Sequence, residues 1–361
     1  MSDQTRAGHY APLLDALHDG GAGPVRDWRI IHLPSNRPPW TDTGLALEAG
    51  DEVSWFASGR VEIMPAMDLW MAPTFALWGR INGGTIFKGK RNTTSFKADS
   101  AGPLMLAVYQ GEWASPDGIL ATPVEAYEGL GGGLDVVVIR WRGRAADGLA
   151  ALLAAAPEDA AAQAEAHRLA HPAVTPEGWK YLWFLGEGEI FSTRMEAGKP
   201  CLHAHTRNDV GILQKPVAAP LTAETALEWS WNLSHLPTSV AEDQAHTHDY
   251  LSIAVEFDNG QDLTYYWSAA LPEGTHYRCP LPMWDQRETH WVLRSGQMGL
   301  GQWHGERRLL LADYAEAIGG PMPSRVVGVW LIAVSIFGHG EGEGRLRDIA
   351  LTGEHGRISV V

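Results

Sequence analysis

Histidines occur in two closely spaced pairs, His203 with His205 and His246 with His248, each pair separated by a single residue. On a β-strand, residues i and i+2 project from the same face, so each pair would present two imidazoles together. Imidazole binds divalent transition metals and is the side chain most easily poised as a general acid or base near neutral pH. The pairs therefore indicate either a metal site formed by these four histidines or a site for proton transfer.

Neighbouring residues would complete the proton-transfer site. Without a metal, His203, His205 and His248 act as acids or bases. Tyr250 is then the proton donor, and Asp249 is the orienting carboxylate. The predicted cofactor is accordingly none or a divalent metal ion. A third interpretation, in which the histidines are solvated or structural, stays open because a chain with 15 His is expected to contain such a pair by chance.

Three further groups combine a carboxylate with His or Arg, and they rank below the histidine pairs. They are Glu288-x-His290, Trp303-His304-x-Glu306-Arg307 and the stretch GHGEGEG at 338–344. The run of charged residues that begins at Glu306 predicts structural ion pairs. Cys201 shares strand parity with His203 and His205, which leaves a Cys–His nucleophile open as well.

An Asn-Gly dipeptide at 259–260 predicts a β-hairpin. It stands between two runs of alternating residues, which is a strong signal for a tight turn. If these two residues form the loop, Ala254 lies opposite Tyr265, and Ser252 lies opposite Trp267.

The two faces of this hairpin differ in character. One carries Leu251, Ile253, Val255 and Phe257. The other carries His248, Tyr250, Ser252, Tyr265 and Trp267, with Glu256 at the turn end. We expect the first face to pack in the core and the second to form a floor for a ligand. The predicted substrate-binding residues are Ser252, Tyr265, Trp267 and Glu256. Alternatively, the aromatic rings pack under loops or beneath a helix.

Strand-like runs dominate both ends of the chain, and 40 Gly, 22 Pro and 16 Trp fit many short strands joined by turns. Residues 145–171 are rich in Ala and predict one or two helices that end at Pro172. The predicted fold class is mostly β, with two jelly-roll β-sandwiches joined by a helical linker. The modules are an N-terminal sandwich over 1–144, the linker over 145–178 and a C-terminal sandwich over 179–361 that carries the site.

The charge of the chain restricts its partners. The formal net charge is −15, and no basic run is long enough to follow a phosphate backbone. Nucleic acid and anionic membranes are therefore disfavoured, and neutral or cationic ligands are favoured. The Gly-rich stretch at 129–138 precedes a strand instead of opening a helix, so no nucleotide-binding loop is predicted.

Several features predict a cytoplasmic protein. The N-terminal residues lack the basic start and apolar run of a signal peptide. No apolar run reaches the roughly 18 residues of a membrane-spanning helix. Two cysteines, Cys201 and Cys279, are fewer than a disulfide-stapled secreted domain uses, so we expect reduced thiols.

The order of features in the first module resembles the bacterial galactophilic lectin-like jelly rolls. It is carried, within residues 28–142, by Trp40-x2-Thr43-Gly44, Gly50-Asp51-x-Val53 and Gly102-Pro103-Leu104-Met105. Those lectins hold calcium and sugar through a late loop rich in Asp, Thr and Asn, which is replaced here by RWRGR at 140–144. The resemblance implies a jelly-roll fold without the calcium motif.

The second module is similar to an uncharacterised proteobacterial domain family of unknown function. Over residues 225–352 the resemblance is carried by Trp303-x2-Glu306-Arg307-Arg308, Asp313-Tyr314, Pro323, Val326-x-Gly328-Val329 and Asp348-Ile349. It implies a galactose-binding-like sandwich and no particular chemistry.

Three functions follow from these features. The first is a lyase, hydratase or hydrolase that uses His and Tyr as acid and base on a neutral hydroxylated molecule in a cleft of the second sandwich. The second is a non-catalytic carbohydrate-binding protein, in which aromatic rings stack on sugar. The third is an assembly role, in which the aromatic surface forms an interface in a homo-oligomer.

Overall fold

The computed structural model describes residues 23–109, 113–354 and 356–361. The N-terminal residues, on which the absence of a signal peptide was predicted, lie outside this part of the chain. Among the described helices, none has both the length and the apolar character needed to cross a membrane.

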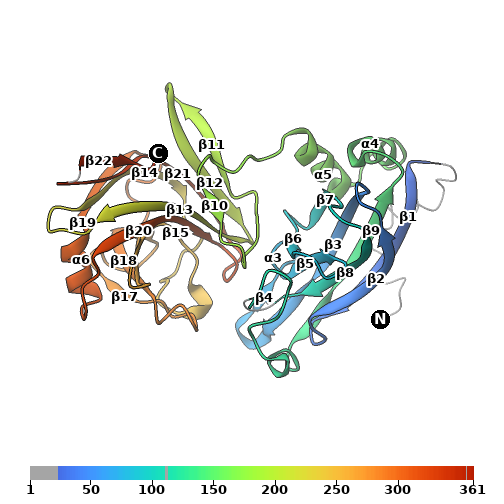
Figure 1. The fold of residues 1–361 in the computed structure, drawn as a ribbon, viewed down its shortest axis with the longest axis horizontal. Helices are drawn as coiled ribbons and strands as arrows, with labels where there is room; N and C mark the ends of the chain where they lie inside the picture. The colour runs from blue at the N-terminus through green and yellow to red at the C-terminus, as the bar shows by residue number, and fades with distance from the viewer. Residues whose placement is uncertain (1–22, 110–112, 355) are drawn as a thin grey trace. The chain divides into compact units, whose positions relative to one another are not determined.

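The chain divides into two compact units. Unit 1 comprises the chain up to Ala173 together with Trp183–Gly188, and unit 2 comprises Val174–Leu182 together with Glu189–Val361. Both units consist mainly of β-strands arranged in two sheets each, which confirms the predicted mostly β fold class (Figure 1).

Unit 1 contains a five-stranded and a four-stranded sheet. The five-stranded sheet consists of β1 (Val25–Pro34), β9 (Gly131–Trp141), β3 (Glu52–Met64), β4 (Leu69–Met71) and β7 (Thr93–Lys97). The four-stranded sheet consists of β2 (Trp40–Leu47), β8 (Gly102–Val108), β5 (Leu77–Ile81) and β6 (Phe87–Lys88). Its helical elements are η2 (Pro65–Met67), α3 (Pro73–Ala76), η3 (Val124–Tyr127), α4 (Ala145–Ala155) and α5 (Ala160–Ala170).

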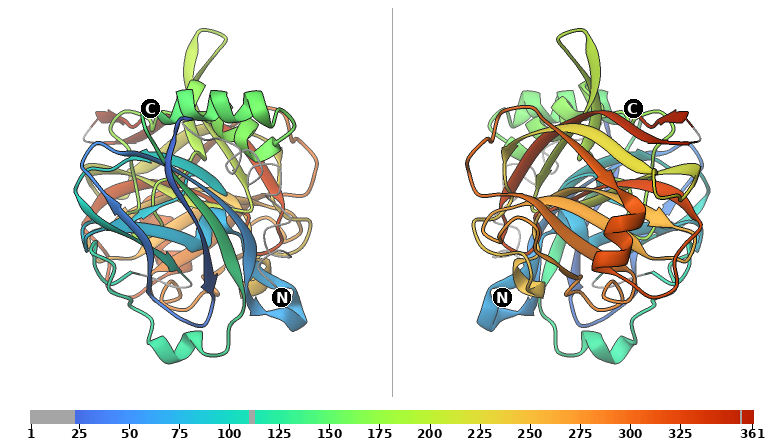
Figure 2. Two further views of the ribbon diagram at one scale, coloured as in Figure 1. Left: turned by 90° about the vertical axis from the view of Figure 1, so that its right-hand side faces the viewer. Right: turned by 90° about the vertical axis from the view of Figure 1, so that its left-hand side faces the viewer.

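The two Ala-rich helices belong to unit 1, which differs from the linker expected over 145–178 (Figures 1 and 2). Leu149 and Leu152 of α4 are buried in one cluster with Phe56 and Trp141 of the five-stranded sheet. Gly148 allows this approach, because a Cβ there would lie 2.2 Å from the Trp141 ring. Small side chains let the helices pack directly on the sheet, so they form a layer of the unit.

Unit 2 contains a seven-stranded and a six-stranded sheet. The seven-stranded sheet consists, in spatial order, of β10 (Lys180–Tyr181), β13 (Val210–Pro220), β20 (Arg325–Val334), β15 (Leu251–Phe257), β16 (Asp262–Ser268), β18 (Glu288–Ser295) and β17 (His276–Arg278). The six-stranded sheet consists of β11 (Phe191–Glu196), β12 (Lys199–Arg207), β21 (Glu341–Gly353), β14 (Ala226–His235), β19 (His304–Leu309) and β22 (Gly356–Ser359). The helical elements are η4 (Ala245–Thr247) and α6 (Leu310–Ala317).

Alternate residues of both sheets of unit 2 meet in one core. Leu202 and Ala204 of β12 belong to the same buried apolar cluster as Ile253 and Val255 of β15. Because side chains alternate along a strand, the residues between them lie on the outer faces of the two sheets. The sandwich therefore has two outer faces that point in opposite directions.

The predicted hairpin forms, but its register differs by one residue. Ser252 lies opposite Tyr266 and Ile253 lies opposite Tyr265, so three residues, 258–260, form the loop. Gly260 has a φ of 78°, which suits the left-handed residue that ends a three-residue hairpin loop. The extra loop residue shifts the returning strand by one position relative to the prediction.

This shift corrects the predicted ligand floor. A slip of one residue turns every side chain of a strand to the other face. Tyr265 and Trp267 therefore lie in the core, with exposed fractions of 0% and 2%, and are not on the polar face. Thr264 and Tyr266 take their place beside Ser252.

Replacing Trp267 with Ala should destabilise unit 2, because the ring fills the core and its Nε1 donates a hydrogen bond to the Gly296 carbonyl at 2.9 Å. We expect Trp267→Ala to lower the free energy of unfolding by about 3–5 kcal/mol, measured by urea unfolding of the whole chain. Met298→Ala, at a side chain that is 90% exposed, is the control. An unchanged midpoint for Trp267→Ala would contradict its position in the core.

Candidate metal centre

A parallel pair of strands positions the site. β16 and β18 run parallel, with Asp262 opposite Glu288 and Thr264 opposite His290. A tight turn cannot join parallel neighbours, so residues 269–287 cross back to the start of β18. The crossover contains β17, and after it the Cys279 N–H donates a hydrogen bond to the Glu288 carbonyl at 3.0 Å. Cys279 is thereby held beside β18.

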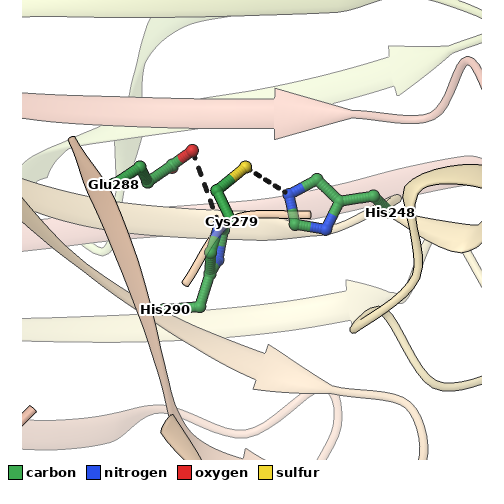
Figure 3. Close-up of side chains that lie close together, drawn as sticks. All are labelled: His248, Cys279, Glu288 and His290. Carbon is green, nitrogen blue, oxygen red and sulfur yellow. Dashed lines mark hydrogen bonds and ion pairs between the residues drawn. The ribbon is translucent and has the colours of Figure 1, made fainter. Parts of the chain in front are cut away.

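Four buried side chains that can bind a metal converge at this point, and we call them the four-residue cluster. They are His248, Cys279, Glu288 and His290, with exposed fractions of 0%, 1%, 3% and 0%. One donor atom from each lies within 4.8 Å of all the others. Cys279 Sγ lies 3.5 Å from His248 Nε2, and His290 Nε2 lies 3.5 Å from Glu288 Oε2 (Figure 3).

A hydrogen bond fixes the orientation of the His248 ring. Its Nδ1 lies 2.6 Å from the Glu242 carbonyl oxygen. A carbonyl only accepts, so Nδ1 carries the proton and Nε2 presents its lone pair to Cys279. Glu242 is itself anchored, because its carboxylate accepts hydrogen bonds from Ser268 Oγ and the Ala269 N–H. This arrangement is typical of a histidine held ready to bind a metal.

Two hydroxyl groups orient the Glu288 carboxylate. Thr264 Oγ1 donates to Oε1 at 3.0 Å, and the Tyr250 hydroxyl donates to the same oxygen at 3.3 Å. The other oxygen, Oε2, faces His290. One carboxylate oxygen is thus satisfied by the protein, while the second points into the cluster.

Aromatic and imidazole rings pack around His290. The Tyr277 ring stacks on it at 5.3 Å, and the rings of His248 and Tyr250 meet it edge-on at 4.6 Å and 4.9 Å. Neither buried ring nitrogen of His290 makes a hydrogen bond, although Nε2 lies 3.5 Å from Glu288 Oε2. A buried polar atom without a partner is costly, and bound metal would satisfy the Nε2 atom.

Burial and charge set the protonation of the cluster. Burial, and then the neighbouring His290, lowers the pKa of His248 to about 3, so its ring is neutral. Burial acts to raise the pKa of Glu288, but the two imidazoles outweigh it and hold this pKa below its usual range. Burial, followed by the charge of Glu288, raises the pKa of the Cys279 thiol. The neutral His248 ring and the Glu288 carboxylate are therefore ready to bind a metal, and the thiol would ionise on metal binding.

The structure does not bring the four predicted histidine ligands into one site. His203 and His205 lie on the outer face of the six-stranded sheet, where their Nε2 atoms lie 2.9 Å from Glu343 Oε1 and 2.6 Å from Glu341 Oε1. His248 lies over the outer face of the seven-stranded sheet. The two faces point in opposite directions, with the core between them.

The other predicted catalytic residues have different partners from those expected. His246 is exposed on η4. The Tyr250 hydroxyl donates to Glu288, and the Tyr250 ring packs edge-on against the His248 ring at 4.8 Å. Asp249 accepts the backbone N–H groups of residues 337–338 at 3.1 Å and 2.6 Å, so it orients that loop and not an imidazole. Burial raises the pKa of Asp249 to about 6.

Ser252 and Glu256 lie on the predicted polar face. Ser252 is buried, and its hydroxyl has no hydrogen-bond partner. Glu256 is half-buried and lies 3.3 Å from Arg287 Nη2 in an ion pair. The face exists as predicted on β15, but it is covered rather than open.

Three members of the four-residue cluster were candidates from the sequence, but Cys279 was not predicted as a ligand. Glu288-x-His290 was singled out because it combines a carboxylate with a histidine, and His248 was a predicted ligand. Cys279 was considered only as a reduced thiol. Its position nine residues before Glu288 was the available signal, but no recognised metal motif has this spacing.

Residues 177–350 match the family model described as protein of unknown function DUF3047. This agrees with the resemblance of the second module to a domain family of unknown function. No curated protein matches the chain.

The chain is also similar to several solved structures. One is the EclA N-terminal domain, a PllA-like lectin, with 19% identity, coverage of 31% of this chain and 95% of that one, and a TM-score of 0.26. Another is the xyloglucanase domain of NopAA, a type three effector from Sinorhizobium fredii, with 8% identity, coverage of 50% and 94%, and a TM-score of 0.30. A third concerns carbohydrate-binding modules of the β-sandwich superfamily, with 9% identity, coverage of 91% and 99%, and a TM-score of 0.25. Likenesses this distant carry no argument about the ligand of this chain.

Both thiols should be unreactive in the folded protein. Cys201 and Cys279 are each 1% exposed, and burial raises the pKa of both, so little thiolate is present at neutral pH. With Ellman's reagent we expect reaction at least about tenfold slower than after unfolding in guanidinium. A thiol that reacts at once in the native chain would instead support the Cys–His nucleophile.

Proposed function

We propose that unit 2 binds one divalent transition-metal ion, Zn²⁺ by the chemistry of its donors, through His248, Cys279, Glu288 and His290. The observation that carries this proposal is the convergence of four buried donor atoms within 4.8 Å. Zinc bonds of roughly 2.0–2.3 Å in a tetrahedron separate the ligand atoms by about 3.3–3.8 Å. The Cys279–His248 and His290–Glu288 separations of 3.5 Å lie in that range.

Charge supports a divalent ion. A Cys279 thiolate and a Glu288 carboxylate contribute two negative charges, and the two imidazoles are neutral. A divalent cation makes the buried centre neutral, which avoids the cost of an isolated charge away from water. Thiolate and imidazole ligands also favour zinc over magnesium or calcium, which prefer oxygen.

The buried position of the four donors favours a structural ion over a catalytic one. Catalytic zinc keeps an open coordination position for water or substrate, whereas structural zinc is closed by four protein ligands. The four-residue cluster supplies four ligands, none of which is more than 3% exposed. We therefore propose a structural role for the ion, in which it stabilises the folded arrangement of unit 2.

Metal content of purified variants tests the proposal. We expect about one zinc ion per chain in the wild type, by inductively coupled plasma mass spectrometry, and a loss of most of it in His248→Ala and Cys279→Ser. The matched controls are His246→Ala, at the exposed histidine two positions earlier, and Cys201→Ser, at the other buried thiol; both should keep the metal. Wild type without metal after growth and purification in zinc would contradict the proposal, as would equal loss in the controls.

As a second candidate function, we propose that the outer face of the six-stranded sheet binds or transforms a neutral hydroxylated molecule. Two histidine–carboxylate pairs favour it, since His203 with Glu343 and His205 with Glu341 lie side by side, with imidazole centres 6.3 Å apart. The hydrogen bond with His205 lowers the pKa of Glu341. An imidazole oriented by a carboxylate is an arrangement suited to acid/base chemistry and to hydrogen bonding of hydroxyls.

Saturation-transfer NMR with D-glucose and D-galactose tests this second candidate. The wild type should give transfer signals that are at least about threefold weaker in His203→Ala/His205→Ala, because each imidazole offers a hydrogen bond to a sugar hydroxyl. His276→Ala, at an exposed histidine of the seven-stranded sheet, is the control. Equal signals in all three proteins, or none in the wild type, would reject the candidate.

A further inference from the structure

We infer that the bound ion fastens two long segments, residues 236–250 and 269–287, to the outer face of the seven-stranded sheet. The order of these segments then depends on the metal, whereas the sandwich beneath them does not. This inference rests on the proposed function, because it assigns a role to the ion at that site.

The ligands come from three separate parts of the chain. His248 belongs to segment 236–250, Cys279 belongs to segment 269–287, and Glu288 with His290 belongs to β18. An ion with ligands from three places is a cross-link, and like a disulfide it restricts the segments it joins. Both segments are longer than ordinary loops, so the entropy of ordering them is large.

Apolar burial does little to hold segment 269–287. Cys279 is its only buried residue. Its large apolar side chains are half-buried or exposed, and Met283 is 57% exposed. Backbone pairing of β17 with β18 and the bond from the Cys279 N–H to Glu288 attach the middle of the segment. Two side chains of this segment therefore reach the four-residue cluster: the buried Cys279, and the half-buried Tyr277, whose ring stacks on His290 at 5.3 Å.

Segment 236–250 is also attached mainly by polar contacts. Its buried residues are Pro237, Glu242, His248, Asp249 and Tyr250, of which only Pro237 is aliphatic, and the half-buried Leu236 packs against the core at the start of the segment. Glu242 joins this segment to the other one, because its carboxylate accepts the Ala269 N–H while its carbonyl accepts the proton of His248 Nδ1. The two segments and the ion therefore form a single connected network over the sheet.

The core of the sandwich has an independent source of stability. The apolar cluster between the two sheets contains residues such as Leu213, Trp231, Ile253 and Leu331, and none of the four proposed ligands is part of it. Regions with few buried apolar contacts open before the core does. Loss of the ion should release the segments while the sandwich stays folded.

Hydrogen exchange of the full chain, followed by mass spectrometry, tests this inference. The zinc-loaded protein is compared with protein stripped by a chelator and with the same protein after Zn²⁺ is restored. We expect exchange at least about tenfold faster in peptides from 236–250 and 269–287 after stripping, reversal on adding zinc, and unchanged exchange in peptides from β13 and β20. Cys279→Ser should exchange like the stripped protein, and Cys201→Ser like the loaded one.

The outcomes separate this inference from the proposal beneath it. If the wild type contains zinc but stripping changes neither segment, the ion binds without fastening them and the inference is wrong. If stripping speeds exchange throughout unit 2, including β13 and β20, the ion holds the whole sandwich and the inference is also wrong. If no preparation contains a metal, the proposed metal binding is wrong, and the inference that rests on it is wrong as well.

Discussion

A carboxylate buried at the start of β18 is the constraint on which the arrangement around it depends. Glu288 is 3% exposed, so its charge cannot be stabilised by water. Two hydroxyls, of Thr264 and Tyr250, satisfy one of its oxygens, and an imidazole faces the other. Hydroxyl groups orient the carboxylate but do not cancel its negative charge. A cation bound at the same point would do so, and this is the physical basis of the metal site that we propose.

The two outer faces of unit 2 use similar residues in different environments. His205 and Glu341 meet where water reaches both side chains, so their ion pair is screened and contributes little to stability. His248, which lies in one of the covering segments, and Glu288 are both buried, so each charge and each missing partner there matters much more. The crossover imposed by the parallel pairing of β16 and β18 creates this difference, because it provides chain to cover one face.

Sequence alone predicted the features that depend on local pattern. Alternation along β15 gave its two faces, and the Ala-rich composition gave α4 and α5. The register of the hairpin was not predicted, because Asn259 does not adopt the positive φ that a two-residue Asn-Gly turn requires, and Gly260 alone is left-handed, as in a three-residue loop. The composition of the four-residue cluster could not be predicted for a related reason. Cys279 and His248 lie in irregular segments, and only the path of the chain in space brings them to Glu288.

The single buried residue of segment 269–287 also bears on how such a chain diverges over evolutionary time. Outside Cys279 and the short pairing of β17, no side chain of this crossover is fully enclosed by the rest of the unit. Exchanges of residue type, and insertions near its exposed turns, leave the core packing as it is. Among proteins with this sandwich, we therefore expect the crossover to vary readily in length and composition, and its cysteine to vary least.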